Sequence, residues 1–302
     1  METQPQYIQF FIGNTEFTLL LHQNMLEEGD SYYSEVHFHA LHELHLLFNG
    51  KLCVDTDASM GITLRGPSGC VFPPRMYHRV YLPKDTMFRR ISLKFLFKKA
   101  AEHADSYDSY SLYKRIFSRS VPLFFDAPES LLSGFWNALK ELSERDGGES
   151  GSFLSTQIAN IISLLFIQIA MQEKPCLSEG DDTACQEYDK SVEYYLRFVQ
   201  IEQALERVVL NGNADEKIGE SLFLSSKQIY RIVEQEYGDN YRNFVRNYRM
   251  KRAEFLLKHD EYSVDQISEI VGYNSVSTFS AMFKKVYHVT PLEFRKRFAC
   301  KG

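Results

Sequence analysis

The stretch QISEIVGYNSVSTFSAMFKKVYH, residues 266–288, decides the fold because an earlier stretch repeats its pattern. Residues 217–238, KIGESLFLSSKQIYRIVEQEYG, align with it when one extra residue is allowed in the second turn, and Tyr237 then matches Tyr287. In each copy a turn separates two amphipathic helical patterns. Two copies of a helix-turn-helix unit are the simplest account of this internal repeat.

The second helix of each copy has an apolar inner face and a polar outer face. In the later copy, Gly272 stands where the first helix ends and a left-handed residue is needed. Small polar residues with scattered Lys and Arg suit a helix that lies against base edges and phosphates, although the solvated face of an all-helical domain would show a similar pattern. The outward positions are Lys227, Gln228, Tyr230, Arg231 and Glu234 in the earlier copy, and Val276, Ser277, Ser280, Ala281 and Lys284 in the later one.

A basic segment joins the two copies. Residues 240–259, NYRNFVRNYRMKRAEFLLKH, predict a helix of about 28 Å, and such a rod could hold two recognition helices roughly 34 Å apart, one DNA turn, on the same face of a duplex. Arg246 lies on this rod among other Lys and Arg side chains, with Glu254 as the lone carboxylate. Phosphate binding depends on such local clusters, so an acidic total charge does not exclude DNA as a partner.

The charge of the chain is divided unevenly. The whole sequence has 34 Lys and Arg against 40 Asp and Glu, but the stretch from Asn213 to Gly302 has 15 against 12. The acidity therefore belongs to the first part of the chain, and the last part is mildly basic. The five cysteines are odd in number and form no C-x-x-C pair, which favours reduced thiols in a cytoplasm over a disulfide framework.

The C-terminal part of the chain resembles the DNA-binding domain of the AraC/XylS family of transcriptional regulators. Residues 263–296, SVDQISEIVGYNSVSTFSAMFKKVYHVTPLEFRK, and the upstream residues 246–257, RNYRMKRAEFLL, carry the resemblance. It implies sequence-specific binding to two successive major-groove segments, one for each repeat. The positions that it implies to face bases are Lys227, Tyr230 and Arg231, then Val276, Ser277 and Ser280.

The sequence departs from the family pattern in both repeats. Ala281 stands where the second recognition helix usually has Arg, whereas Lys284 and Lys285 keep the usual lysines there. After the first recognition helix, Glu234 and the glutamine that follows it replace those lysines. We therefore expect Arg231 to carry most of the direct base reading and the second repeat to contribute backbone contacts.

The first 125 residues predict β-structure. YIQFFI and TEFTLLL flank Gly13-Asn14, which is a hairpin signal because both residues tolerate positive φ. Short apolar or alternating runs follow, separated by Gly, Pro and Asp at short intervals. This spacing favours an antiparallel sandwich or barrel.

A cluster of histidines lies in this region. In HFHALHELHLLFNG, residues 37–50, even spacing would place His37, His39 and Glu43 on one face of a strand, and His78 follows in PPRMYH. Three imidazoles and a carboxylate suit Fe, Mn, Ni or Zn. The four residues are therefore a candidate metal set as well as candidate ligand-binding residues.

The histidine pattern resembles the first cupin motif closely and the second one weakly, because Arg75 and Pro67 stand where that motif has Gly. One interpretation is a metal-dependent cupin enzyme that acquired a helical appendage. The other is a sensor barrel whose histidines bind a small polar ligand such as a carbohydrate. Regulators of the resembled family keep an H-x-H-x-x-x-E strand without known catalysis, so the resemblance favours the sensor, with no cofactor and no enzymatic activity.

Two amphipathic helices are expected after the strands, at residues 129–145 and 152–172, and the resemblance implies that they dimerise. Their apolar faces could equally pack against the barrel. Residues 153–171, FLSTQIANIISLLFIQIAM, imitate a membrane span, but their amide and hydroxyl side chains would be costly in hydrocarbon. A buried or dimer-forming helix is therefore expected instead.

These observations predict an α+β multi-domain chain, in which an antiparallel, cupin-like β-barrel with a helical hairpin precedes an all-α domain with two helix-turn-helix repeats. The expected parts are a barrel over 1–125, a hairpin over 126–172, a linker over 173–189 and a DNA-binding domain over 190–302. The expected function is that of a cytoplasmic, sequence-specific transcription regulator. It would bind double-stranded DNA and a small-molecule effector as a homodimer, and it would not associate with a membrane.

Overall fold

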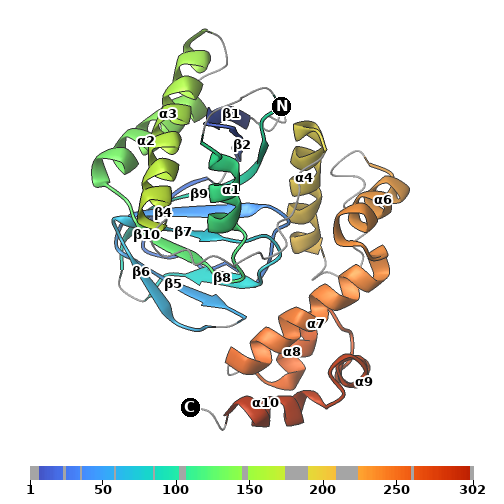
Figure 1. Cartoon of the computed structure of the whole chain (residues 1–302). Helices are drawn as coiled ribbons and strands as arrows, with labels where there is room; N and C mark the ends of the chain where they lie inside the picture. The colour runs from blue at the N-terminus through green and yellow to red at the C-terminus, as the bar shows by residue number, and fades with distance from the viewer. Residues whose placement is uncertain are drawn as a thin grey trace. The chain divides into compact units, whose positions relative to one another are not determined.

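The chain divides into two compact units, unit 1 (Met1–Val192) and unit 2 (Glu193–Gly302). The computed structural model of the chain describes residues 7–22, 25–34, 36–57, 59–83, 86–101, 107–144, 149–173, 190–208, 224–259 and 262–299 (Figure 1). The linker expected at 173–189 lies outside the described residues, apart from its first residue, Glu173.

Unit 1 contains two antiparallel β-sheets. The larger sheet has the strand order β1-β2-β9-β4-β7-β10, with β3 also paired to β9, and the smaller sheet has the order β6-β5-β8. The strands are β1 (Tyr7–Ile12), β2 (Thr15–Leu20), β3 (Leu26–Gly29), β4 (His42–Asn49), β5 (Lys51–Thr56), β6 (Ile62–Arg65), β7 (Ser68–Phe72), β8 (His78–Tyr81), β9 (Phe88–Lys99) and β10 (Leu123–Asp126). The antiparallel architecture predicted for the first part of the chain is confirmed.

The β1–β2 hairpin forms where Gly13-Asn14 predicts it. Ile12 pairs with Thr15 across the two-residue turn, and Gly13 has a φ of 57°, which a side chain would disfavour. The amide nitrogen of Asn14 donates to Asp108, so the turn is also tied to the start of the first helix.

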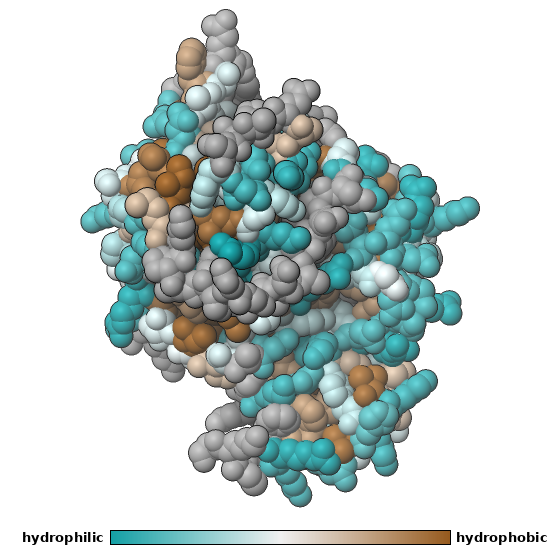
Figure 2. Space-filling model, viewed as in Figure 1, coloured by the Kyte–Doolittle hydropathy of each residue, from teal (hydrophilic) through white to brown (hydrophobic). Residues whose placement is uncertain are grey.

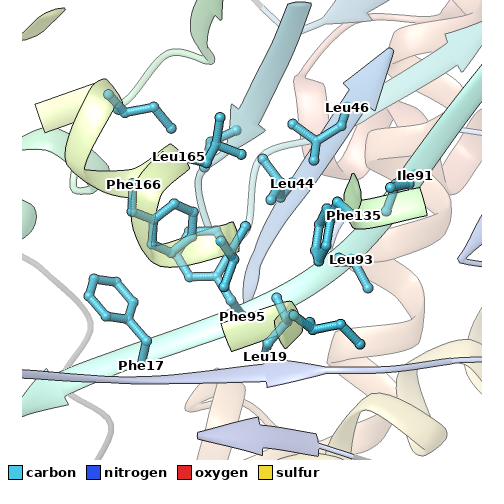
Figure 3. Close-up of a cluster of buried hydrophobic side chains, with 14 of the residues drawn as sticks. Phe17, Leu19, Leu44, Leu46, Ile91, Leu93, Phe95, Phe135, Leu165 and Phe166 are labelled. Atoms are coloured by element: carbon cyan, nitrogen blue, oxygen red, sulfur yellow. The ribbon is translucent and has the colours of Figure 1, made fainter. Parts of the chain in front are cut away.

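The helices in the described part of unit 1 before the unit boundary are α1 (Ser109–Phe117), α2 (Glu129–Glu144) and α3 (Glu149–Glu173). Figure 1 shows α2 and α3 side by side next to the larger sheet. Their inner faces share one core with the strands, and Figure 3 shows Phe135 of α2 and Phe166 of α3 in the cluster that includes Phe95 of β9. Both predicted helices are present, and their apolar faces pack against the sheet.

Over Ser152–Glu173, α3 is long and apolar enough to cross a membrane by length and composition alone, with 39% of that window buried inside the molecule. The side chains of α3 in the core of unit 1 are Leu154, Ile158, Ile162, Leu165, Phe166, Ile169 and Ala170. Phe153, Leu164 and Met171 lie on another side of the helix and are exposed. Core packing therefore accounts for one apolar face of α3, and a second set of apolar side chains on the helix stays exposed to solvent.

Unit 2 is helical throughout its described regular structure. Its helices are α4 (Val192–Val208, which begins at the unit boundary), α6 (Ser226–Tyr237), α7 (Tyr241–His259), α8 (Val264–Ile270), α9 (Val276–Tyr287) and α10 (Pro291–Ala299). Apolar side chains from α7, α8, α9 and α10 form one core around Phe279 and Phe283. The all-helical prediction is confirmed for the described residues of unit 2.

Capping interactions define the starts of α8 and α10. Ser263 and Gln266 form a capping box in which the Ser263 hydroxyl accepts from the Gln266 N–H at 3.1 Å and the Gln266 amide oxygen accepts from the Ser263 N–H at 2.8 Å. Thr290 and Glu293 exchange the same pair of bonds at the start of α10. Gly272 has a φ of 80° after α8, as predicted for a left-handed helix end.

Candidate DNA-binding face and histidine network

The helix α6 buries one face and exposes the other. Its buried side chains are Ile229, Ile232 and Val233. Its exposed side chains include the four predicted to contact DNA in this repeat, Lys227, Gln228, Tyr230 and Arg231. The positions that the resemblance implies to face bases therefore lie on the outer surface of unit 2.

Two of these side chains also have partners within the domain. The Gln228 amide oxygen accepts from the backbone N–H and the hydroxyl of Ser225, each at 2.9 Å, and completes a capping box at the start of α6. The Tyr230 ring packs on Tyr241, with centroids 4.7 Å apart. Arg231 is the side chain on this face whose planar guanidinium can donate two parallel bonds to a guanine edge.

The helix α9 presents a smaller polar face. Its exposed residues include Ser277, Ala281, Lys284 and Lys285, while Val276 and Ser280 are half-buried. Ser275 caps the helix by accepting from the Thr278 N–H at 3.2 Å. With alanine at position 281, this face offers hydroxyls and point charges rather than a guanidinium fork, which suits phosphate contacts better than bidentate base contacts.

The basic segment between the repeats forms α7, and several of its arginine side chains are buried or half-buried against neighbouring residues. Arg252 is only 2% exposed. Arg249 lies over the Tyr273 ring, 5.7 Å from its centroid, and burial lowers the pKa of this guanidinium. Arg246, the predicted DNA contact on this helix, is half-buried and donates to the Asn247 side chain at 3.3 Å. Fewer α7 cations can reach phosphates than the sequence indicates.

Equivalent contacts support the two outward helices. Tyr237, the last residue of α6, donates its hydroxyl hydrogen to Glu202 of α4. Tyr287, the last residue of α9, donates in the same way to Glu254 of α7, at 2.8 Å. The repeat alignment matches these two tyrosines, and the structure gives the reason, because each one ties its helix to a longer helix behind it.

Unit 1 brings together the four predicted residues of the histidine set. One nitrogen or oxygen from each of His37, His39, Glu43 and His78 lies within 4.8 Å of the others. The prediction that His37 and His39 share a strand face with Glu43 is wrong, because β4 begins only at His42. The residues meet by another route, since His37 forms an antiparallel bridge with His78 at the start of β8.

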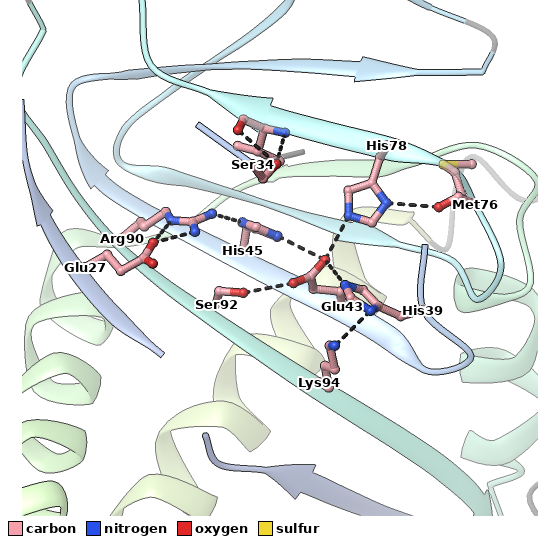
Figure 4. A network of polar contacts seen from close by, with 11 residues as sticks. Glu27, Ser34, His39, Glu43, His45, Met76, His78, Arg90, Ser92 and Lys94 are labelled. Carbon is pink, nitrogen blue, oxygen red and sulfur yellow. Dashed lines mark hydrogen bonds and ion pairs between the residues drawn. The ribbon is translucent and has the colours of Figure 1, made fainter. Parts of the chain in front are cut away.

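Glu43 is the centre of this network (Figure 4). Its Oε2 lies 2.9 Å from Nε2 of His78 and 3.3 Å from the same atom of both His39 and His45. Its Oε1 accepts from the Ser92 hydroxyl at 3.0 Å. The carboxylate therefore faces four hydrogen-bond donors in the interior of unit 1.

Two buried cations fix the tautomers of two imidazoles. Lys94 Nζ lies 2.8 Å from His39 Nδ1, and Arg90 Nη1 lies 2.7 Å from His45 Nδ1. Charged Lys and Arg side chains have no lone pair to offer, so each Nδ1 must accept. Each neutral ring then carries its proton on Nε2, which points toward Glu43.

His78 has acceptors on both sides of its ring. Nδ1 lies 3.0 Å from the Met76 carbonyl oxygen, and Nε2 lies 2.9 Å from Glu43. A carbonyl oxygen can only accept, so Nδ1 donates its hydrogen to Met76, and Nε2 joins the ring to the Glu43 carboxylate. The ring also stacks on Phe72, with centroids 4.0 Å apart.

Burial and neighbouring charges set the pKa values in this network. Burial, assisted by Lys94, lowers the pKa of His39 to about 3, and burial also lowers the pKa of His45. Burial alone would raise the pKa of Glu43, but His39 and His45 hold that pKa well below its ordinary value. The carboxylate of Glu43 is therefore ionised.

The histidine motif predicts no role for His42 or His45, and the structure separates them. His45 belongs to the network, and its position two residues after Glu43 could have indicated this, because alternate residues share a strand face. His42 points to the other face of β4, where Nε2 lies 3.1 Å from the Phe117 carbonyl oxygen and the ring stacks on Phe95. Burial lowers the pKa of His42 to about 4.

The donor set fits a metal ion only in part. His78 gives its Nδ1 hydrogen to a backbone carbonyl, which is the outer contact typical of a metal-binding histidine, and Glu43 is a suitable anionic ligand. His39 does not fit, because Nε2 would be available to a metal only if Nδ1 carried the proton, and Nδ1 faces the ammonium of Lys94. Hydrogen bonding among these side chains accounts for their arrangement.

Comparison with known proteins defines the class of domain in unit 2. Residues 218–297 match a family model described as a helix-turn-helix domain. The chain is 32% identical over 79 residues to the Msm operon regulatory protein of Streptococcus mutans, which is 26% of this chain and 28% of that protein. It is 24% identical over 202 residues to an HTH-type transcriptional regulator, YdeC, of Bacillus subtilis, which is 63% of each chain. The chain thus covers less than two thirds of these relatives.

The matched helix-turn-helix domain covers both predicted repeats in their described parts and the helix between them. Among solved structures, a transcriptional regulator with an AraC-type DNA-binding domain from Chromobacterium violaceum is 22% identical. The match covers 37% of this chain and 100% of that one, with a TM-score of 0.33. A likeness at this TM-score carries no conclusion of its own.

Proposed function

We infer that the chain is a transcription regulator whose unit 2 binds double-stranded DNA in a sequence-specific way. The observation that carries this proposal is the pair of helices α6 and α9, which bury apolar faces in a matched helix-turn-helix domain and expose polar ones. The connecting helix α7 has 19 residues. Its length of about 28 Å is comparable to one DNA turn of about 34 Å, so α6 and α9 could enter successive major-groove segments.

The helix α6 would make most of the base contacts, and α9 would mainly contact phosphates. Arg231, with Lys227 and Tyr230 beside it, would read base edges from α6. On α9, Lys284 and Lys285 would contact phosphates, with Val276, Ser277 and Ser280 near the bases. Arg246 would add a phosphate contact from α7, and Gln228 would act mainly as a helix cap.

Binding of the full-length protein to random-sequence duplex DNA should fall steeply as salt rises. Each phosphate neutralised by a Lys or Arg contributes about −0.9 to the slope of log affinity against log salt concentration. The double variant Lys284→Ala, Lys285→Ala should reduce that slope by about 2, whereas Lys51→Ala, an exposed position in unit 1, should leave it unchanged. Affinity that does not respond to salt would contradict DNA binding.

Unit 1 would be the sensor of a small polar effector, such as a carbohydrate, without catalysis and without a required cofactor. The residues assigned to this role are His37, His39, Glu43 and His78. The support is chemical, because a few convergent polar groups in an apolar interior are what a site for a polar ligand needs. A cytoplasmic location, a cupin-like barrel and the domain boundaries expected from the sequence belong to the same proposal.

The second apolar face of α3 would form the homodimer. Its residues follow one another at alternating steps of four and three positions, the spacing of a coiled-coil seam: Phe153, Gln157, Asn160, Leu164, Ile167 and Met171. Phe153 is 77% exposed and Met171 is 73% exposed. Figure 2 shows hydrophobic surface at the upper left, in the region of α2 and α3.

The double variant Leu164→Glu, Ile167→Glu should therefore be monomeric where the unaltered protein is dimeric. Two carboxylates in the centre of the seam would remain unpaired and desolvated in the dimer. Light scattering, measured as the protein elutes from a size-exclusion column, gives the molecular mass of the oligomer directly. The control is Thr156→Glu, which places a carboxylate on an exposed position beside the seam and should leave the dimer intact. A dimer that survives the double variant would rule out this face.

A further inference from the structure

Unit 1 has a pocket of about 370 Å³ beside the histidine network. It is lined by the end of β5 with the turn that follows, the start of β6, the turn between β7 and β8, and the segment between α1 and β10 together with Phe124 of β10. The volume lies within the range of small-molecule sites. Its walls mix apolar side chains such as Met76 and Phe124 with the hydroxyl of Thr56.

The charged groups that line the pocket favour an anion. Arg75 and Arg119 are its two guanidinium groups, and Asp57 is its one carboxylate among the lining residues. A guanidinium matches a carboxylate or a phosphate with two parallel hydrogen bonds, which a neutral hydroxyl compound cannot reproduce with the same strength. Among the lining residues guanidinium groups thus outnumber carboxylates by one, and the partner of Arg119, Glu173, lies outside the lining.

One wall of the pocket is hydrogen-bonded to the histidine network. The Arg75 N–H donates to the His39 carbonyl oxygen at 2.5 Å, and His78 Nδ1 donates to the Met76 carbonyl oxygen at 3.0 Å. Arg75 also has a φ of 65°, a left-handed conformation that is unfavourable for a residue with a side chain. A ligand that contacts this turn would act directly on the residues that hold the network.

The opposite wall is connected to the end of α3. Arg119 forms an ion pair with Glu173, the last residue of that helix, and both side chains are partly shielded from solvent, at 26% and 16% exposed. In the sequence, residues 174–192 separate Glu173 from the start of unit 2. The pocket thus shares an arginine with the end of α3, the last helix of unit 1 among its described residues before the unit boundary.

We propose that this pocket binds a small molecule that carries a carboxylate or phosphate group, and that the anion competes with Glu173 for Arg119. The proposal rests on the sensor role of unit 1, gives the polar effector an acidic group, and places it beside His37, His39, Glu43 and His78 rather than among them. Binding would transfer Arg119 from the helix end to the ligand and leave Glu173 without its cation. The ligand would thereby change the end of α3, which is the point from which the chain leads to the DNA-binding unit.

The test compares anions with matched neutral compounds on the full-length protein. Isothermal titration with benzoate and with phenyl phosphate should give binding, and benzyl alcohol should give none at the same concentrations. Arg119→Gln should weaken binding of both anions by about tenfold or more, because it removes a charge-assisted contact. Arg115→Gln, an exposed arginine on α1 outside the pocket lining, should change nothing.

Glu173→Gln separates competition from simple attraction. It removes the competitor for Arg119 and should tighten anion binding by about fivefold, which is the scale of a partly exposed ion pair. Equal binding of benzyl alcohol and benzoate, no binding of either anion, or unchanged binding after Arg119→Gln would overturn the proposal, as would weaker binding after Glu173→Gln. DNA binding by the same preparations would show that the regulator assignment survives such a failure.

Discussion

Replacing Glu43 by Ala is expected to lower the free energy of unfolding of unit 1 by about 3–5 kcal/mol, because removal of one partner from a buried ionic network leaves its remaining charges uncompensated. The carboxylate accepts from Ser92 and faces three imidazole N–H groups, and Lys94 and Arg90 are buried just behind them. The single tryptophan, Trp136, is buried in α2. Its fluorescence during a urea titration therefore reports on unit 1.

Glu28→Ala is the matched control for this measurement. Glu28 also pairs with an arginine of β9, Arg89, but the two side chains are 58% and 45% exposed. Solvent screens such a pair, so the control should change the free energy of unfolding by no more than about 0.5 kcal/mol. If Glu43→Ala costs no more than Glu28→Ala, the network does not depend on its central carboxylate.

Replacing Arg231 by Ala is expected to weaken binding to the preferred DNA sequence by about 1–3 kcal/mol, roughly 5- to 150-fold, and to change binding to random duplex much less. Arg231 is exposed on the outer face of α6, while Gln228 beside it is engaged in the helix cap. A guanidinium that donates two bonds to one guanine discriminates between sequences. Titration of labelled duplexes with the full-length protein measures both affinities.

Arg231→Lys distinguishes base reading from phosphate binding. Lysine keeps the positive charge but lacks the planar fork, so it should not restore the preference for the selected sequence if Arg231 reads a base. If lysine restores the affinity, or if both DNAs lose affinity equally in Arg231→Ala, then Arg231 contacts a phosphate. The sequence-reading role would then pass to another residue of α6 or α9.

Much of unit 2 could be predicted because its signals are local. A cap such as Ser263 with Gln266 involves residues three positions apart, and the apolar stripes of α8 and α9 recur every three or four positions. The same spacing occurs at Ser225 and Gln228, which form the capping box of α6. Burial of Arg252 could not be predicted, because α7 contacts α6, α8 and α10 and lacks a single polar face.

The histidine network was predicted less completely because it depends on strand register. His45 lies opposite Ser92 and Glu43 lies opposite Lys94 in the pairing of β4 with β9, which brings together residues that are far apart in the sequence. Local patterns do not state which strands become neighbours, and a shift of one residue would reverse every side chain. The motif indicated that histidines would gather, but not that Lys94 would orient one of them.

Selection of bound sequences from random duplex DNA, with the full-length protein, tests the central claim most directly. If α6 reads base edges while α9 mainly contacts phosphates in the next major-groove segment, the selected DNA should contain one strongly preferred segment, and preference should be weak about one helical turn, roughly 10 base pairs, away. Arg231→Ala should remove the strong preference. A bound pool with no enriched sequence, or an enrichment that Arg231→Ala leaves unchanged, would contradict the assignment of α6 as the base-reading helix.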